Sequence, residues 1–80
     1  MKLNLIAYGI TKDVLGNRHV EYHLSEGETV HDLLLSLERA YPELQGLASL
    51  RIAVNGEYAD AHQRISSQDE IVLIPPVSGG

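Results

Sequence analysis

The residues best suited to chemistry stand at the end of the sequence, where a hydrophobic segment runs into Pro75-Pro76-Val77-Ser78-Gly79-Gly80. Adjacent prolines fix their φ angles and donate no backbone hydrogen bond, so this segment favours an extended, polyproline-like path over another strand. Six residues in that form reach roughly 20 Å, enough to enter the active site of a neighbouring protein. Gly79 and Gly80 have no side chain, which leaves a carboxylate at Gly80 unhindered. The segment therefore suits a carboxyl group that is presented as a reagent.

The histidines are the residues that could suggest a metal site, and His19 and His23 have the spacing of four that chelates a metal on a helix. Residues 18–24, however, alternate between apolar and polar as a strand does, which would place the two rings about 13 Å apart. His31 and His62 stand alone in the sequence. We therefore expect solvated or structural histidines and no metal centre.

The composition excludes several other kinds of chemistry. The sequence contains no cysteine, so disulfides, thiolate metal sites and cysteine catalysis are absent, and no segment resembles a nucleophile elbow. The formal net charge of −5, from 6 Lys and Arg against 11 Asp and Glu, argues against binding to nucleic-acid phosphates. The longest apolar run is far shorter than a membrane span, and the first residues do not resemble a secretory signal. A single domain in the cytoplasm, without nucleic-acid or membrane partners, is the expectation.

Several segments have the composition or the alternation of β-strands: 3–10, 18–24, 50–54 and 70–74. Asn55-Gly56 is a strong hairpin signal and predicts a short returning strand that starts at Tyr58 and Ala59. The nearly unbroken apolar run at 70–74 favours a central strand buried on both faces. Residues 11–16 read as a turn or short helical loop, and residues 43–49 as a linker.

One amphipathic helix is expected after Thr29, which with Asp32 forms a pattern close to a capping box. Apolar residues then recur on a single stripe: Val30, Leu33, Leu34, Leu37 and Tyr41. Pro42 ends the helix, and Leu35 projects away from the stripe. The order of elements predicts an α+β domain over residues 1–74, in which one helix covers one sheet, followed by a functional tail over residues 75–80.

Taken together, the chain resembles the β-grasp, ubiquitin-like sulfur carriers, and among these most closely the small subunits of molybdopterin synthase. The most specific part is 69–80, in which an acidic pair, an apolar strand and a Pro-Pro-Val-small-Gly-Gly ending follow one another. Ala53-Val54-Asn55-Gly56 also resembles the family. The thiamine-pathway carriers share the final glycines but usually lack the two prolines. The resemblance implies a mixed sheet of four to five strands, one main helix packed on it and an extended C-terminal tail.

The resemblance also implies a mechanism and a set of partners. An adenylyltransferase resembling ubiquitin-activating enzymes would use ATP to adenylate Gly80, and a sulfur donor protein would convert the adenylate to a thiocarboxylate. The large subunit of a heterotetrameric synthase would then accept the tail and sulfurate a cyclic pterin phosphate. In this scheme Gly80 carries the sulfur and Gly79 permits entry, and the chain binds no cofactor itself. Four further residues would form the partner-binding arm: Ser78 and Val77 lining the channel, and Pro76 and Pro75 holding the arm straight.

Three alternatives remain open from the sequence. The carrier could deliver sulfur to another pathway, such as that of cysteine, thiamine or another thiolated metabolite. The chain could be a protein modifier that forms isopeptide bonds through Gly80, or an interaction module with an inert tail. The sequence does not decide whether Leu35 or Tyr58 belongs to an interface.

Overall fold

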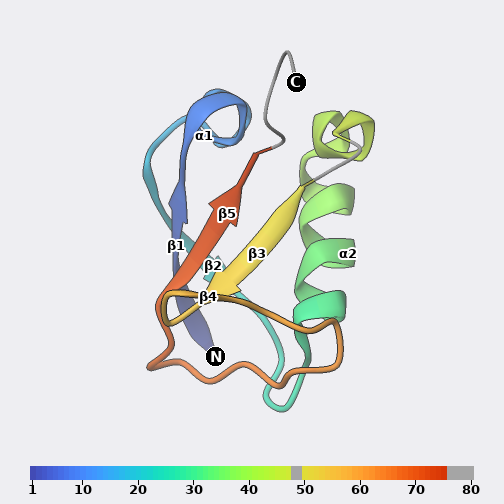
Figure 1. Cartoon of the computed structure of the whole chain (residues 1–80). Helices are drawn as coiled ribbons and strands as arrows, with labels where there is room; N and C mark the ends of the chain where they lie inside the picture. Colours follow the sequence, from blue (N-terminus) through green and yellow to red (C-terminus); the bar gives the residue numbers. More distant parts are fainter. Residues whose placement is uncertain (48–49, 76–80) are drawn as a thin grey trace.

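The computed structural model describes residues 1–47 and 50–75 of the chain. Figure 1 shows the elements in chain order: β1 (Lys2–Ala7), α1 (Gly9–Leu15), β2 (His19–His23), α2 (Val30–Ala40), the 3₁₀ helix η1 (Pro42–Gly46), β3 (Arg51–Val54), β4 (Glu57–Tyr58) and β5 (Ile71–Ile74). Among the described residues, neither helix has the length and apolar character needed to cross a bilayer.

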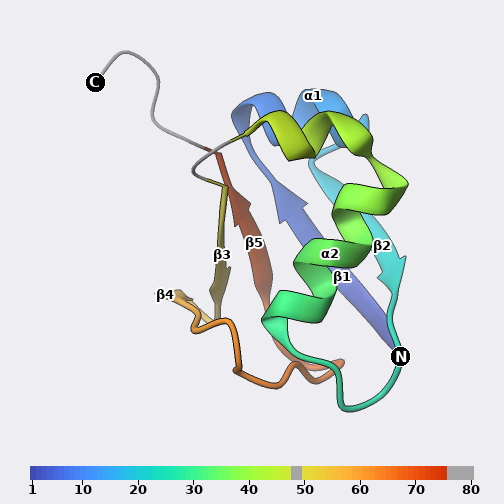
Figure 2. The same cartoon turned by 90° about the vertical axis from the view of Figure 1, so that its right-hand side faces the viewer.

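The strands form one mixed sheet in the order β2-β1-β5-β3-β4. β5 runs parallel to β1 and antiparallel to β3, while the β1–β2 and β3–β4 pairs are antiparallel. Helix α2 lies across one face of this sheet, as Figure 2 shows. A mixed sheet with one main covering helix is the β-grasp arrangement, so the expected fold is confirmed.

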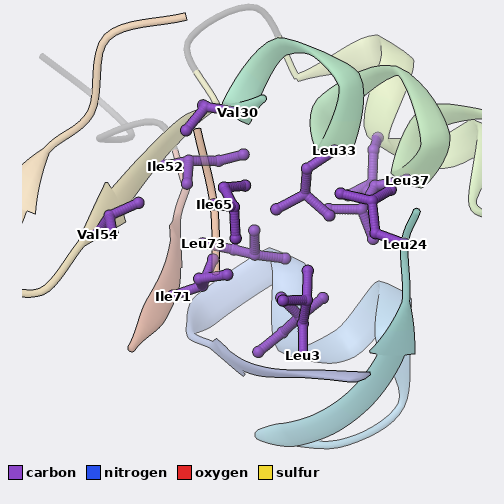
Figure 3. Close-up of a cluster of buried hydrophobic side chains, with 12 residues drawn as sticks. Leu3, Leu24, Val30, Leu33, Leu37, Ile52, Val54, Ile65, Ile71 and Leu73 are labelled. Carbon is purple, nitrogen blue, oxygen red and sulfur yellow. The ribbon is translucent and has the colours of Figure 1, made fainter. Parts of the chain in front are cut away.

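The core fills the space between α2 and the sheet (Figure 3). Leu33 and Leu37 of α2 belong to one cluster with Leu5 of β1 and with Ile71 and Leu73 of β5, and all five residues are fully buried. The prediction that β5 is central is confirmed, but burial on both faces is wrong. Val72 and Ile74 are only half-buried because α2 covers one face of the sheet and the opposite face carries no comparable helix among the described residues.

The N-terminus of α2 has the capping box that the sequence predicts. The Thr29 backbone N–H donates to Asp32 Oδ2 at 2.9 Å, and the Asp32 N–H donates to Thr29 Oγ1 at 3.3 Å. These bonds satisfy backbone donors that a helix start otherwise leaves without partners. The α-helix ends at Ala40, two residues before Pro42, as expected.

Two sequence-based boundaries are wrong. The first strand stops at Ala7 rather than Ile10, because Gly9 adopts a left-handed φ of +55° and the chain turns into α1. The segment expected to be a linker contains η1, whose Leu44 is fully buried and completes the core beside α2. The first boundary thus follows from the conformation of Gly9, and the second from the inward packing of Leu44.

Candidate functional site

The candidate site is the root of the tail, where β5 ends at Ile74 and the chain continues into Pro75. β5 is held from both sides, since it pairs with β1 and with β3 and buries Ile71 and Leu73 completely. Pro75 is half-buried and follows this strand directly. The core therefore fixes the point from which the tail departs. Figure 1 places this end of β5 beside α1.

Most of the predicted site residues lie beyond this point. Pro76, Val77, Ser78, Gly79 and Gly80 fall outside the residues that the structure describes, and the predicted division between the domain and the tail at residue 75 stays a prediction. Pro75 is the one predicted site residue whose surroundings can be given.

Pro75 lies against Gly9, a contact that the sequence analysis did not identify. The parallel register pairs Ala7 with Leu73, so two residues further along each chain Gly9 comes beside Pro75. A Cβ atom built on Gly9 would lie 3.2 Å from Pro75 Cγ, tighter than ordinary van der Waals contact. The approach of Pro75 to the backbone at this point thus depends on the missing side chain.

Thr11 holds the turn that presents Gly9. Its side chain is fully buried, and Oγ1 accepts a hydrogen bond from the Tyr8 N–H at 3.0 Å and donates to the Tyr8 carbonyl oxygen. A buried hydroxyl needs such partners, because an unpaired one would cost about 1–3 kcal/mol. In the sequence, Gly9 followed two residues later by Thr11 indicates a turn, but it does not indicate a contact with Pro75.

The sheet face opposite α2, here called the outer face, carries half-buried apolar residues beside the tail root. Strand alternation and the pairing register place Ile6, Val72 and Ile74 on it. Tyr58 pairs with Ala53 on the same face, and 62% of this residue is exposed. Tyr8 and Ile10, on either side of Gly9, are also exposed large hydrophobic residues. An apolar surface therefore surrounds the point where the tail leaves.

Two arginines stack on tyrosines around this apolar surface. The Arg51 guanidinium lies 4.6 Å from the centroid of the Tyr58 ring, and that of Arg18 lies 5.5 Å from the Tyr8 ring. Neither forms an ion pair within residues 1–47 and 50–75. Stacking of this kind is worth about 0.5–1 kcal/mol at exposed sites and holds the guanidinium in place. In a chain with a net charge of −5, the tail root thus has fixed positive charge beside it.

The opposite end of β5 contains a hydrogen-bonded clamp that joins two motifs of the sequence. Asn55 Nδ2 donates to Asp69 Oδ1 at 2.9 Å, and the Glu70 N–H donates to Asn55 Oδ1 at 2.9 Å. Asp69 Oδ2 also accepts from the Ser66 N–H at 2.8 Å. The hydrogen bonds from Ser66 and Asn55 lower the pKa of Asp69 below 3.8. The clamp holds the carboxylate as an anion and fixes the start of the strand that bears the tail.

The histidines form no metal site in the part of the chain that the structure describes. His19 and His23 are exposed on β2, and no group of three or more His, Asp or Glu residues there could hold an ion. Asp32 is occupied in the α2 cap, where hydrogen bonds from the Thr29 backbone and side chain lower its pKa.

The sequence of this chain is similar to one protein family and to several known proteins. The model of the ThiS family matches residues 7–80. A molybdopterin synthase sulfur carrier subunit from Dictyostelium discoideum is 34% identical over 83 residues, which cover 99% of this chain and 96% of that protein. Small archaeal modifier protein 1 from Haloferax volcanii is 32% identical over 77 residues, which cover 85% of this chain and 88% of that protein.

Solved structures resemble the fold over the whole chain. A crystal structure of SAMP1 from Haloferax volcanii has a TM-score of 0.82 and 28% identity, with full coverage of both chains. A complex of subunits 1 and 2 of the molybdopterin-converting factor from Helicobacter pylori contains a chain with a TM-score of 0.68, full coverage of both chains and 22% identity. At 22% identity, the similarity to the Helicobacter pylori chain shows a shared fold.

Proposed function

Since this chain belongs to the ThiS family, we propose that it is the sulfur carrier subunit of a molybdopterin synthase. The observation that carries the proposal is the Pro-Pro-Val-Ser-Gly-Gly segment placed directly after the central strand β5. The relative from Dictyostelium discoideum, which bears that name and matches almost end to end, supports the choice of pathway. That the active chain ends at Gly80 is part of the proposal.

The chemistry begins at the Gly80 carboxylate. Its ordinary pKa of about 3.3–3.7 makes it an anion and a poor electrophile at neutral pH, so it must be activated. A carboxylate oxygen bonds to the α-phosphorus of ATP on an adenylyltransferase, and pyrophosphate leaves. A sulfide equivalent from the donor protein then attacks the carbonyl carbon, and AMP leaves. The product is a thiocarboxylate, which stores the sulfur on the main chain of a protein that has no thiol of its own.

Delivery occurs in the large subunit of the synthase. Pro75 and Pro76 keep the arm extended, Val77 and Ser78 line the channel, and Gly79 allows the tip to enter. Two such deliveries convert a cyclic pterin phosphate to a dithiolene. This acidic chain is poorly suited to bind a phosphorylated substrate, so substrate binding and proton transfer belong to the large subunit.

The apolar outer face is the surface that we assign to both partners. It surrounds the tail root, and Arg51 and Arg18 add charge that acidic side chains of a partner could pair with. One tail cannot occupy two active sites, so the activating enzyme and the large subunit must bind in turn. Ordering each tail residue costs about 1–2 kcal/mol, which favours release from one partner before the next. We place this cycle in the cytoplasm, in keeping with a cysteine-free sequence.

Deletion of Gly79 and Gly80 tests the proposal. Reconstitution with an activating enzyme, a sulfur donor, a large subunit and a cyclic pterin phosphate should give dithiolene product with the full chain. The deleted chain should give none, while its unfolding midpoint stays that of the full chain. Product formation by the deleted chain would refute the proposed role of Gly80.

A protein-modifier function is the second candidate, because the chain is also similar to small archaeal modifier protein 1. The same acyl adenylate would then react with a lysine amine to form an isopeptide bond. Recovery of lysine-linked conjugates, rather than a thiocarboxylate, would favour this function. Product from the pterin substrate separates the leading proposal from carriers that serve the cysteine or thiamine pathways.

A further inference from the structure

Gly9 and Pro75 are brought together by the parallel pairing of β1 and β5. Ala7 pairs with Leu73, and the two chains diverge only after this point, one into α1 and the other into the tail. Gly9 therefore lies beside Pro75, where the tail begins.

Two independent properties make a side chain unfavourable at position 9. Its φ of +55° is a left-handed conformation that side chains other than Asn and Asp rarely adopt. A Cβ at this position would also lie 3.2 Å from Pro75 Cγ, which is too close for an ordinary contact. Its distance from Pro75 Cβ would be 3.9 Å, which is an ordinary van der Waals contact. The close contact therefore comes from the ring of Pro75 rather than from the atoms that an alanine would retain.

Pro75 has little freedom to adjust to such a contact. Its ring fixes its own φ near −65°, and Pro76 after it restricts its ψ to extended values. When both dihedral angles of Pro75 are restricted, a displacement of its ring would be passed on to the direction of the chain after it.

We propose that Gly9 is a positioning residue that aims the tail by giving the Pro75 ring a flat backbone surface to rest on. This inference rests on the proposed function, since it assigns to Gly9 the delivery of Gly80 to the partner active site. The domain would dock on the partner as before in a Gly9 variant, but the tip would arrive in the wrong place. Misplacement by about 1 Å can lower a rate by about 100-fold.

A set of matched variants separates the effect of the contact with Pro75 from the effect of backbone strain at a glycine. Gly9→Ala introduces both the strain and the contact with Pro75. Gly16→Ala, at the other end of α1, introduces a similar strain at φ +89° with nothing within 4 Å of the new Cβ. The double variant Gly9→Ala with Pro75→Ala keeps the strain but removes the ring.

Steady-state adenylation of the full chain by its activating enzyme is the activity to measure. We expect Gly9→Ala to lower kcat at least about tenfold at nearly unchanged KM, and Gly16→Ala to retain kcat. The double variant should have nearly the same kcat as Pro75→Ala alone. Gly9→Ala should therefore lower kcat much less in a chain without the Pro75 ring than in the natural sequence. Equal kcat for the two glycine variants, or a loss from Gly9→Ala that is as large in the Pro75→Ala chain as in the natural sequence, would overturn the proposal.

A readout without any partner distinguishes this inference from the proposed function. The amide chemical shifts of Ile74, Val77 and Ser78 should move in Gly9→Ala and stay in place in Gly16→Ala. The double variant should differ much less from Pro75→Ala than Gly9→Ala differs from the natural sequence. Unmoved shifts in Gly9→Ala would overturn the positioning role. Absence of a thiocarboxylate on the natural sequence, with the shift pattern as expected, would overturn the sulfur-carrier function and leave the contact intact.

Discussion

Asn55 Nδ2 donates a hydrogen bond to Asp69 Oδ1 at 2.9 Å, across 14 residues of sequence. The same side chain accepts from the Glu70 N–H, and the Asn55 N–H donates to the Glu70 carbonyl oxygen at 2.8 Å. The hairpin after β3 and the entry to β5 are therefore one structural unit. The two motifs that resemble the sulfur carriers outside the tail meet in it, so their shared role is to fix the strand that presents the tail.

Replacement of Asn55 measures what this unit contributes to stability. Asn55 has a φ of +54°, so Asn55→Gly removes the side-chain bonds without backbone strain, whereas Asn55→Ala adds strain. We expect the first variant to lose about 1–2 kcal/mol of unfolding free energy and the second about 1 kcal/mol more. Urea denaturation measures both. Equal stability of Asn55→Gly and the natural sequence would show that the clamp does not support the fold.

Acid should destabilise the domain through Asp69 and Asp32. Hydrogen bonds lower the pKa of both carboxyl groups in the folded state below the ordinary value for aspartate. Their contribution to stability is therefore complete above the unfolded-state pKa and is lost as the pH falls through the lower folded-state values. We expect the unfolding free energy to fall below about pH 4. Asn55→Gly, in which Asp69 loses a donor, should show a shallower fall, and an unchanged slope would contradict this account.

Leucines on opposite sides of α2 should differ sharply in their effect on folding. Leu37 is fully buried in the core, and Leu37→Ala should cost about 2–5 kcal/mol of unfolding free energy. Leu35, a residue that is 39% exposed, is the matched control and should change stability by less than about 0.5 kcal/mol on substitution by alanine. Similar losses for the two variants, measured by thermal or urea unfolding, would be inconsistent with the packing described here.

Local patterns predicted the elements of this fold better than its contacts. The capping pair Thr29 and Asp32 and the hairpin at Asn55 depend on residues close in sequence, so the sequence was enough to place them. The inward packing of Leu44 could not be predicted, because it depends on how the chain folds back onto α2.

In the candidate site too, the local motif could be predicted from the sequence and the long-range contact could not. The sequence identifies the tail because Pro75 and the residues after it form a local motif. The contact of Pro75 with Gly9 depends on a parallel pairing between the first and last strands, which no local pattern predicts.

The outer face can be tested through Tyr58. If both partners dock there, Tyr58→Ala should raise the Kd for the activating enzyme and for the large subunit about tenfold, because exposed aromatic residues that become buried contribute strongly to binding. Leu35→Ala, on the helix that covers the other face, should leave both Kd values unchanged. Titration calorimetry with each partner measures them. A loss confined to Leu35→Ala would place the interface on α2 instead.

The most direct test of the sulfur-carrier account is the intact mass of the chain after incubation with its activating enzyme, ATP and a sulfur donor. The account predicts a population in which one oxygen is replaced by sulfur, located at Gly80 by fragmentation and absent when ATP is omitted. A chain that remains a carboxylate while the enzyme releases pyrophosphate, or that carries sulfur at another residue, would contradict it.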